Sequence, residues 1–224
     1  MDKGILLVGN KCALLSAIET ETAKRAERYA LALIPNRYAA SDSSAADALF
    51  PGRLPLEWNP GSPVSARSLI IGAQNRLGRI DEAVFVCSPP SSNCSVADLS
   101  LADLEVMAHD QIKGWFLLAK ELCAYFMNQG SGILATVYCE SGAKDDAGDL
   151  LGSAALSAFR SLSRSLLDTS AGGSSIMLSF ASGDAGGQAV DDAGFASFIS
   201  RHLEEGNRKS SGKLFRYGKH SLFK

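Results

Sequence analysis

The sequence predicts a doubly wound parallel α/β sheet in three layers, folded as a single domain over residues 1–224. Short apolar runs that end at turn residues alternate with longer segments of helical periodicity. Several of the runs are apolar throughout, as is typical of strands covered on both faces of a parallel sheet. The strand–helix units are too few to close a barrel. The doubly wound arrangement is therefore favoured.

The expected strands are apolar runs closed by Gly, Pro, Ser or Asn. They span residues 4–10, 31–36, 83–88, 132–138, 175–182 and 213–217, with a short one around 54–58. The expected helices carry apolar residues at three- and four-residue spacing. They span residues 13–32, 64–78, 101–128, 150–167 and 191–205. Ser100, with Asp103 three residues later, predicts the N-cap of the third helix.

Composition excludes several classes of function. A net charge of −2 and 21% charged residues give no electrostatic reason to expect nucleic acid or an anionic membrane as partner. No segment approaches the ~18 consecutive apolar residues of a membrane span, and the N-terminal run is too short for a signal peptide. The five cysteines form no CxxC pair, and the three histidines are scattered. We therefore expect a cytoplasmic protein with reduced thiols and no metal cluster.

Five stretches, in a fixed order, carry a resemblance to a known family. They are residues 78–88 (GRIDEAVFVCS), 98–122, 130–138 (GSGILATVY), 157–167 (SAFRSLSRSLL) and 211–223. Together they resemble the short-chain dehydrogenase/reductase family, in particular 3-oxoacyl-[acyl-carrier-protein] reductase-like proteins, over nearly the whole chain. The resemblance implies a Rossmann-like fold and NAD(P)-dependent oxidoreductase chemistry.

The family's cofactor turn is largely absent. That turn lies between the first strand and helix, and its glycines let the backbone approach the pyrophosphate. In VGNKCALL only Gly9 remains, because Ala13 and Leu15 stand at the other two glycine positions. Lys11 offers a phosphate one charge, or is simply solvated. We therefore expect no bound cofactor, or NAD(P) held through Gly9 and Lys11 if any.

Two further cofactor-contact stretches of the family have changed character. Its Asn-Asn-Ala-Gly segment corresponds to residues 85–88, Phe-Val-Cys-Ser, and its adenine-side Asp-Val pair falls near Asn59 and Pro60. The stretch 183–195, where the family places its substrate lid, is short. These differences weaken the case for an enzyme.

The family's catalytic Asn, Ser, Tyr and Lys correspond to Gln111, Cys139, Gly152 and Leu156. The Ser-to-Tyr and Tyr-to-Lys intervals agree with the family's spacing, and no tyrosine in the chain is followed by lysine four residues later. Glycine carries no acid or base, and general acid–base catalysis contributes roughly 10²–10⁴-fold to rate. The resemblance thus implies a catalytic set in which no member is intact.

Structural roles remain open for the polar residues nearby. Cys139 is a structural thiol, or a nucleophile if a neighbour lowers its pKa. Gln111 bridges the mid-helix distortion of this fold. Asp145, Asp146 and Asp149 form a solvated loop that favours the following helix start through its dipole, or a metal or substrate site.

The leading hypothesis is a non-catalytic subunit or scaffold that acts through helices 101–128 and 150–167. It forms a homo-oligomer, or joins an active reductase paralogue, in a fatty-acid or polyketide type of pathway. Small residues permit close approach on the second helix; they are Gly152, Ala154, Ala155, Ala158 and Ser161. The alternatives are an NAD(P)-dependent carbonyl or 3-oxoacyl reductase in which Tyr138 or Cys139 substitutes, and a dinucleotide sensor.

Overall fold

A seven-stranded parallel sheet forms the centre of the computed structural model, which describes residues 3–37, 50, 52–90, 96–140, 149–169, 175–183, 191–206 and 208–218. Its order is β3-β2-β1-β4-β5-β6-β7. The strands are β1 (Ile5–Asn10), β2 (Tyr29–Ile34), β3 (Arg53–Leu56), β4 (Glu82–Cys87), β5 (Ile133–Glu140), β6 (Ile176–Gly183) and β7 (Lys213–Tyr217). Central strands are buried along their whole length, as the apolar runs predict.

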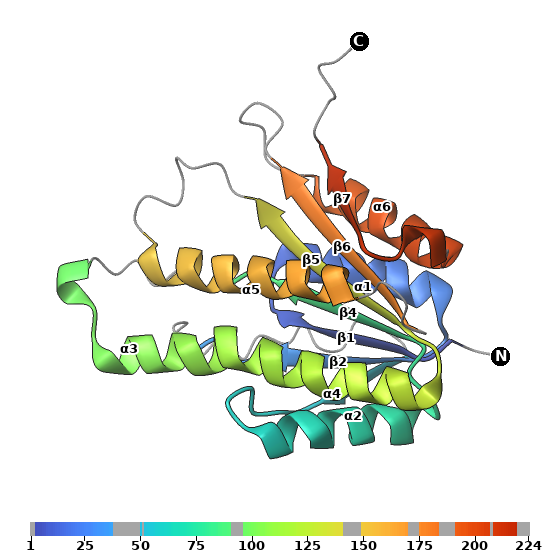
Figure 1. Cartoon of the computed structure of the whole chain (residues 1–224), viewed down its shortest axis with the longest axis horizontal. Coiled ribbons are helices and arrows are strands. Elements are labelled where there is room, and N and C mark those ends of the chain that lie inside the picture. The colour runs from blue at the N-terminus through green and yellow to red at the C-terminus, as the bar shows by residue number, and fades with distance from the viewer. Residues whose placement is uncertain are drawn as a thin grey trace, which may run out of the picture.

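Helices cover both faces of this sheet, with α2, α4 and α5 side by side on one face (Figure 1). The other face is covered by α1 and α6. The longer helices are α1 (Ala13–Arg25), α2 (Pro63–Leu77), α4 (Gly114–Gln129), α5 (Leu150–Thr169) and α6 (Asp192–Glu205). The predicted doubly wound, three-layer architecture is confirmed.

The first helix is shorter than predicted. It ends at Arg25 rather than near residue 32, and β2 begins at Tyr29 rather than at residue 31. Pairing explains the difference, because Tyr29 aligns with Ile5 on one side and Arg53 on the other. The Tyr29 hydroxyl also donates to the buried Glu19 at 2.7 Å. These long-range contacts override the helical pattern of the alanine-rich segment.

The predicted helix 101–128 is continuous but distorted. Its first part is α3 (Leu101–Val106), and a π-helical segment, η3 (Met107–Lys113), joins it to α4. The Ser100 hydroxyl accepts a bond from the Asp103 N–H at 3.1 Å, so the predicted N-cap is confirmed. The π-helical segment buries Met107, Asp110 and Gln111.

The two largest apolar clusters of the described residues lie between the sheet and its helices. The larger lies under α2, α4 and α5, where the fully buried Trp115 ring has its centroid 5.2 Å from that of Phe85 and 4.9 Å from that of Phe159. The smaller lies under α1 and α6. At the start of β4 the buried Glu82 is held by Arg25 at 2.6 Å and Lys3 at 2.7 Å.

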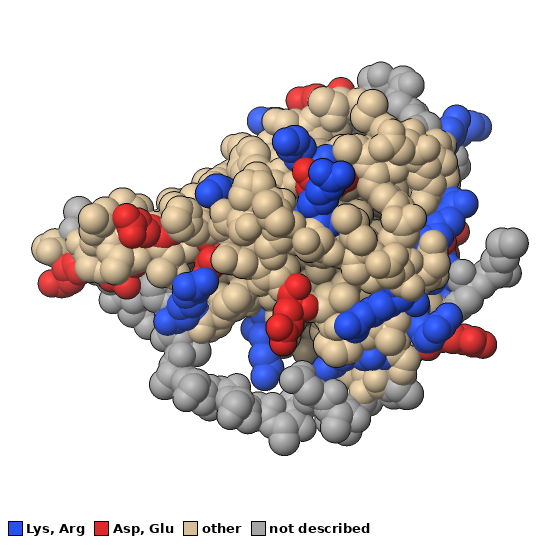
Figure 2. Space-filling view, turned by 90° about the horizontal axis from the view of Figure 1, so that it is seen from below, with Lys and Arg blue, Asp and Glu red and all other residues tan. Residues whose placement is uncertain are grey.

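The surface carries charges of both signs. Figure 2 shows one face on which uncharged side chains cover most of the area and basic and acidic side chains are interspersed. Among the described residues no helix is long and apolar enough to cross a membrane.

Candidate functional site

A pocket of ≈ 220 Å³ lies where β4 and β5 end and α5 begins. Ligand sites of open parallel sheets occur at this carboxyl edge. Three positions singled out in the sequence, Cys139, Gly152 and Leu156, line the pocket together. The other lining residues are Cys87, Ser88, Pro89, Asp149 and Ser153.

The carboxylate of Asp149 takes the space beside Gly152. The Gly152 N–H donates to Asp149 Oδ1 at 3.1 Å, and a Cβ at Gly152 would lie 2.0 Å from Asp149 Oδ2. Asp149 therefore caps the start of α5, as expected of an acidic residue there. A tyrosine does not fit at this position unless the cap is broken. Asp145 and Asp146 lie outside the described residues.

Gln111 does not line the pocket but is linked to it through Asn10. The Asn10 side-chain amide donates to Gln111 Oε1 at 2.9 Å, while Asn10 Oδ1 accepts from the Ser88 N–H at 3.0 Å. Both side chains are almost fully buried. One amide thus ties the ends of β1 and β4 to the π-helical segment.

The turn between β1 and α1 is filled by its own residues. Leu15 is buried, and its Cδ1 lies 3.5 Å from where a Cβ on Gly9 would be. The Leu15 N–H donates to Cys12 Sγ at 3.4 Å, so the thiol caps the helix. Lys11 is exposed, and no partner occurs for it among the described residues. These residues do not fit a dinucleotide pyrophosphate, which needs a glycine backbone and open N–H groups at that helix start.

A second set of contacts lies at the same edge of the sheet, near Asn59 and Pro60, where the resemblance places the family's adenine-side pair. Arg37, after β2, binds the buried Asp110 of the π-helical segment at 2.8 Å. A Cβ on Gly114 would lie 2.5 Å from Pro60 Cβ, so the Asn59–Pro60 turn packs directly on the start of α4. Burial raises the pKa of Asp110, although Arg37 opposes that shift.

Two thiols at this edge, Cys12 and Cys87, are not activated. Burial raises the pKa of Cys12 and of Cys87, so both are protonated at neutral pH and react slowly. Cys139 is half-buried and lines the same pocket as Asp149. No group of three or more His, Cys, Asp or Glu side chains in the described part of the chain could hold a metal ion.

Sequence reasoning missed Asn10, Arg37 and Asp110. Their partners are remote in the chain, 101 residues away for the Asn10–Gln111 bond. The one available signal was a polar residue at the end of an apolar strand, as for Asn10, or a few residues beyond it, as for Arg37.

Solved structures with the same fold are numerous. A short-chain type dehydrogenase/reductase from Mycobacterium marinum is 16% identical, with a TM-score of 0.80 over 98% of this chain and 95% of that one. Levodione reductase is 14% identical, with a TM-score of 0.77 over 97% of each chain. Acetoin dehydrogenase YohF from Salmonella typhimurium is 16% identical, with a TM-score of 0.76 over 97% and 96%.

No family model matches the sequence, and no curated protein matches it. At these identities the structural likeness concerns the fold alone. The chain therefore has the fold of the short-chain dehydrogenases/reductases.

Proposed function

We propose that this protein is a non-catalytic subunit or scaffold that pairs with a second copy of itself through the α3–α4 and α5 helices. The observation that carries the proposal is an apolar groove of ≈ 620 Å³ between α4 and α5. Its lining residues include Phe116, Ala119, Met127, Leu162 and Leu166.

Exposed apolar side chains gather at this helix pair. Of the eight large apolar side chains exposed in the described residues, five lie on it. They are Leu101, Leu104, Phe116, Met127 and Leu150. Phe116 and Met127 also line the groove, and an exposed apolar patch of this kind often marks an interaction site. Self-pairing would bury two such patches at once, because a two-fold interface places the same patch on both sides.

The small residues predicted to line the second helix divide into two groups. Gly152 and Ala155 are buried within the chain, Ala155 beside Met107 of the π-helical segment. Ala154 and Ser161 are exposed and Ala158 is half-exposed, so these three remain available on the outer side of α5. They permit close approach of a partner helix beside the groove.

The site at the sheet edge supports a role without catalysis. Gly152 and Leu156 provide no acid or base, and the first turn is filled by Leu15 and Cys12. An NAD(P)-dependent carbonyl or 3-oxoacyl reductase with substitute groups, and a dinucleotide sensor, are the competing functions. Each of them requires a bound dinucleotide.

Titration with NADH and NADPH, followed by nicotinamide fluorescence, separates these functions. We expect no saturable change up to millimolar cofactor. Saturable binding would overturn the non-catalytic proposal and favour the reductase or the sensor.

Light scattering on the purified chain tests the pairing independently. We expect a mass twice that of the 23.6 kDa chain. A monomer at every concentration would contradict self-pairing; a mass that doubles only after mixing with a reductase of the same fold would move the proposal to a mixed complex.

A further inference from the structure

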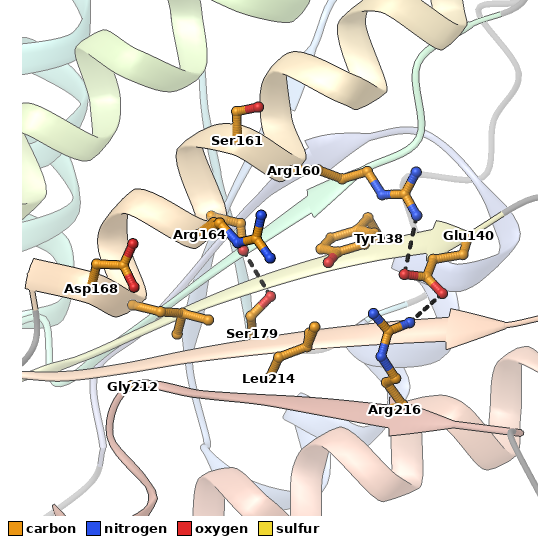
Figure 3. Close-up of a pocket in the computed structure, with 12 residues that line it drawn as sticks. Tyr138, Glu140, Arg160, Ser161, Arg164, Asp168, Ser179, Gly212, Leu214 and Arg216 are labelled. Carbon is orange, nitrogen blue, oxygen red and sulfur yellow. Dashed lines mark hydrogen bonds and ion pairs between the residues drawn. The ribbon is translucent and has the colours of Figure 1, made fainter.

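A second pocket, of ≈ 410 Å³, lies on the opposite side of α5 from the groove, between that helix and the edge of the sheet at β7. Figure 3 shows its residues converging from β5, α5, β6 and β7. Three arginines border it, Arg160 and Arg164 from α5 and Arg216 from β7. Such a concentration of guanidinium groups around one cavity occurs nowhere in the site described above.

Glu140 holds two of these arginines in place. Its Oε1 lies 3.1 Å from Arg160 Nη2, and its Oε2 accepts a short bond from Arg216. Arg160 also stacks over the Tyr138 ring, 5.5 Å from its centroid. Each guanidinium has five N–H donors, so both retain donors after binding Glu140. Glu140 therefore orients a pair of cations without exhausting them.

Two groups in the pocket lack partners among the described residues. Arg164 makes no ion pair there, and the Tyr138 hydroxyl makes no hydrogen bond. Tyr138 is only 5% exposed, and its hydroxyl end points toward Arg164 and Ser179 (Figure 3). Because Tyr138 lines the pocket, its hydroxyl can donate a hydrogen bond to a ligand that enters there.

The hydroxyls beneath the pocket do not supply that partner. Ser163 bonds Ser179 at 2.7 Å and Thr136 at 2.5 Å, which links these three side chains to one another. Asp168 lies at the other end of the pocket from Glu140 (Figure 3). Counting both acidic residues, the pocket retains an excess of positive charge.

We propose that this pocket binds the phosphoryl group of a small organic phosphate. A phosphoryl group has three terminal oxygens in different directions, which matches donors from Arg164, Tyr138 and the Arg160–Arg216 pair better than a planar carboxylate. The volume exceeds that of the phosphoryl group alone. Leu214, 38% exposed on β7, offers an apolar wall for the rest of the molecule.

Isothermal titration calorimetry with phenyl phosphate tests the assignment on the full chain. Binding should be saturable and should weaken about tenfold or more in Arg164→Gln and in Tyr138→Phe, because each loses one hydrogen bond to a charged group. Arg164 is exposed, and phenylalanine keeps the ring of Tyr138, so both variants should fold. Arg67→Gln, which removes an exposed arginine of α2, is the matched control and should bind as the wild type does.

Two further probes sharpen the class of ligand. Inorganic phosphate should bind more weakly than phenyl phosphate if the apolar wall is used, and benzoate more weakly than either. Absence of phenyl phosphate binding overturns the proposal. If benzoate binds as tightly as phenyl phosphate, the choice of a phosphoryl group is overturned. If Arg67→Gln weakens binding as much as Arg164→Gln and Tyr138→Phe do, the binding is not specific to this pocket and the proposal is overturned. None of these outcomes depends on dinucleotide binding.

Discussion

At the scale of single residues, Asn10 holds the ends of β1 and β4 against the π-helical segment. Its amide joins three segments far apart in the chain, and it does so while 5% exposed. Removal leaves the Ser88 N–H and the Gln111 carbonyl oxygen without their partner, and an unsatisfied buried polar group costs more than the bond itself contributes.

We expect Asn10→Ala to lower the free energy of unfolding by about 2–3 kcal/mol, since two hydrogen bonds are lost in a buried setting. Urea denaturation followed by circular dichroism measures the change. Asn75→Ala, at an exposed position of α2, is the control and should fall within about 0.5 kcal/mol of the wild type. Equal effects of the two substitutions would show that the amide network contributes nothing.

Gly152 offers a second test at this scale. Rebuilding the absent catalytic pair as Gly152→Tyr with Leu156→Lys places a Cβ 2.0 Å from the Asp149 carboxylate. We expect no NADPH oxidation with carbonyl substrates and a loss of about 1–3 kcal/mol in stability from overpacking and the broken cap. Adding Asp149→Ala should recover part of that loss. Detectable turnover in the double variant would mean that the cofactor cleft is open after all.

At the scale of elements, the π-helical segment and the turn after β3 form one packed unit. The segment turns Asp110 and Gln111 inward, and the Asn59–Pro60 turn rests on Gly114 immediately after it. Glycine is required there by close approach rather than by backbone angle, because its φ is an ordinary helical −56°.

Gly114→Ala should therefore destabilise the protein by about 1–3 kcal/mol, as overpacking does. Gly72→Ala, in the middle of α2, is the matched change: its Cβ would lie 3.6 Å from Leu56 Cδ2, an ordinary contact. Better helix propensity should stabilise that variant by about 0.5–1 kcal/mol. Thermal denaturation of both variants measures the two changes in stability, which should have opposite signs. Changes of the same sign would contradict the packing argument.

Elements were predictable where one chain segment decides its own structure. Buried parallel strands appear in the sequence as apolar runs, and Ser100 correctly predicted the N-cap of its helix. The end of α1 was not predictable, because Tyr29 becomes a strand residue only when Ile5 and Arg53 lie beside it. The same limit applies to sites. The family resemblance pointed to Cys139, Gly152 and Leu156, whereas the Glu140–Arg216 pair joins residues 76 apart in the chain. The four-residue spacing of Arg160 and Arg164 was the one local signal for that pocket.

At the scale of the whole molecule, stability should fall at alkaline pH. Burial raises the pKa of three thiols, Cys12, Cys87 and Cys123, and of the Tyr29 phenol. In the unfolded chain these groups lose protons first, so the unfolded state binds fewer protons and becomes favoured as pH rises. The contribution is complete below the ordinary thiol pKa of about 8.5 and is lost above it.

Urea denaturation at several values between about pH 7.5 and 9.5 should show this decline, with each fully buried thiol adding at most about 1.4 kcal/mol per pH unit. Cys87→Ala should have a shallower slope than the wild type, whatever its absolute stability. Parallel slopes for the two proteins would show that Cys87 ionises as easily when folded as when unfolded.

Self-pairing makes a prediction at the same scale. Met127→Glu places a charge in the groove at a side chain that is 74% exposed, so folding should be preserved while dimers dissociate. Val64→Glu on α2, where the side chain is 75% exposed, is the matched control and should stay dimeric. Sedimentation velocity compares the two. If both dissociate, or neither does, the interface lies elsewhere.

The order of the sheet also bears on how the protein is made. β4, β5, β6 and β7 are neighbours in the sheet in the order in which they leave the ribosome. All four strands of the half-sheet β3-β2-β1-β4 have been synthesised once Cys87 is added. The later strands β5, β6 and β7 then extend the sheet one after another from the open edge of β4. Arg216 sits on the last strand to be added. The arginine-lined pocket beside β7 therefore exists only once β7 has joined the sheet, so a ligand held there would distinguish folded chains that contain β7 from every shorter intermediate.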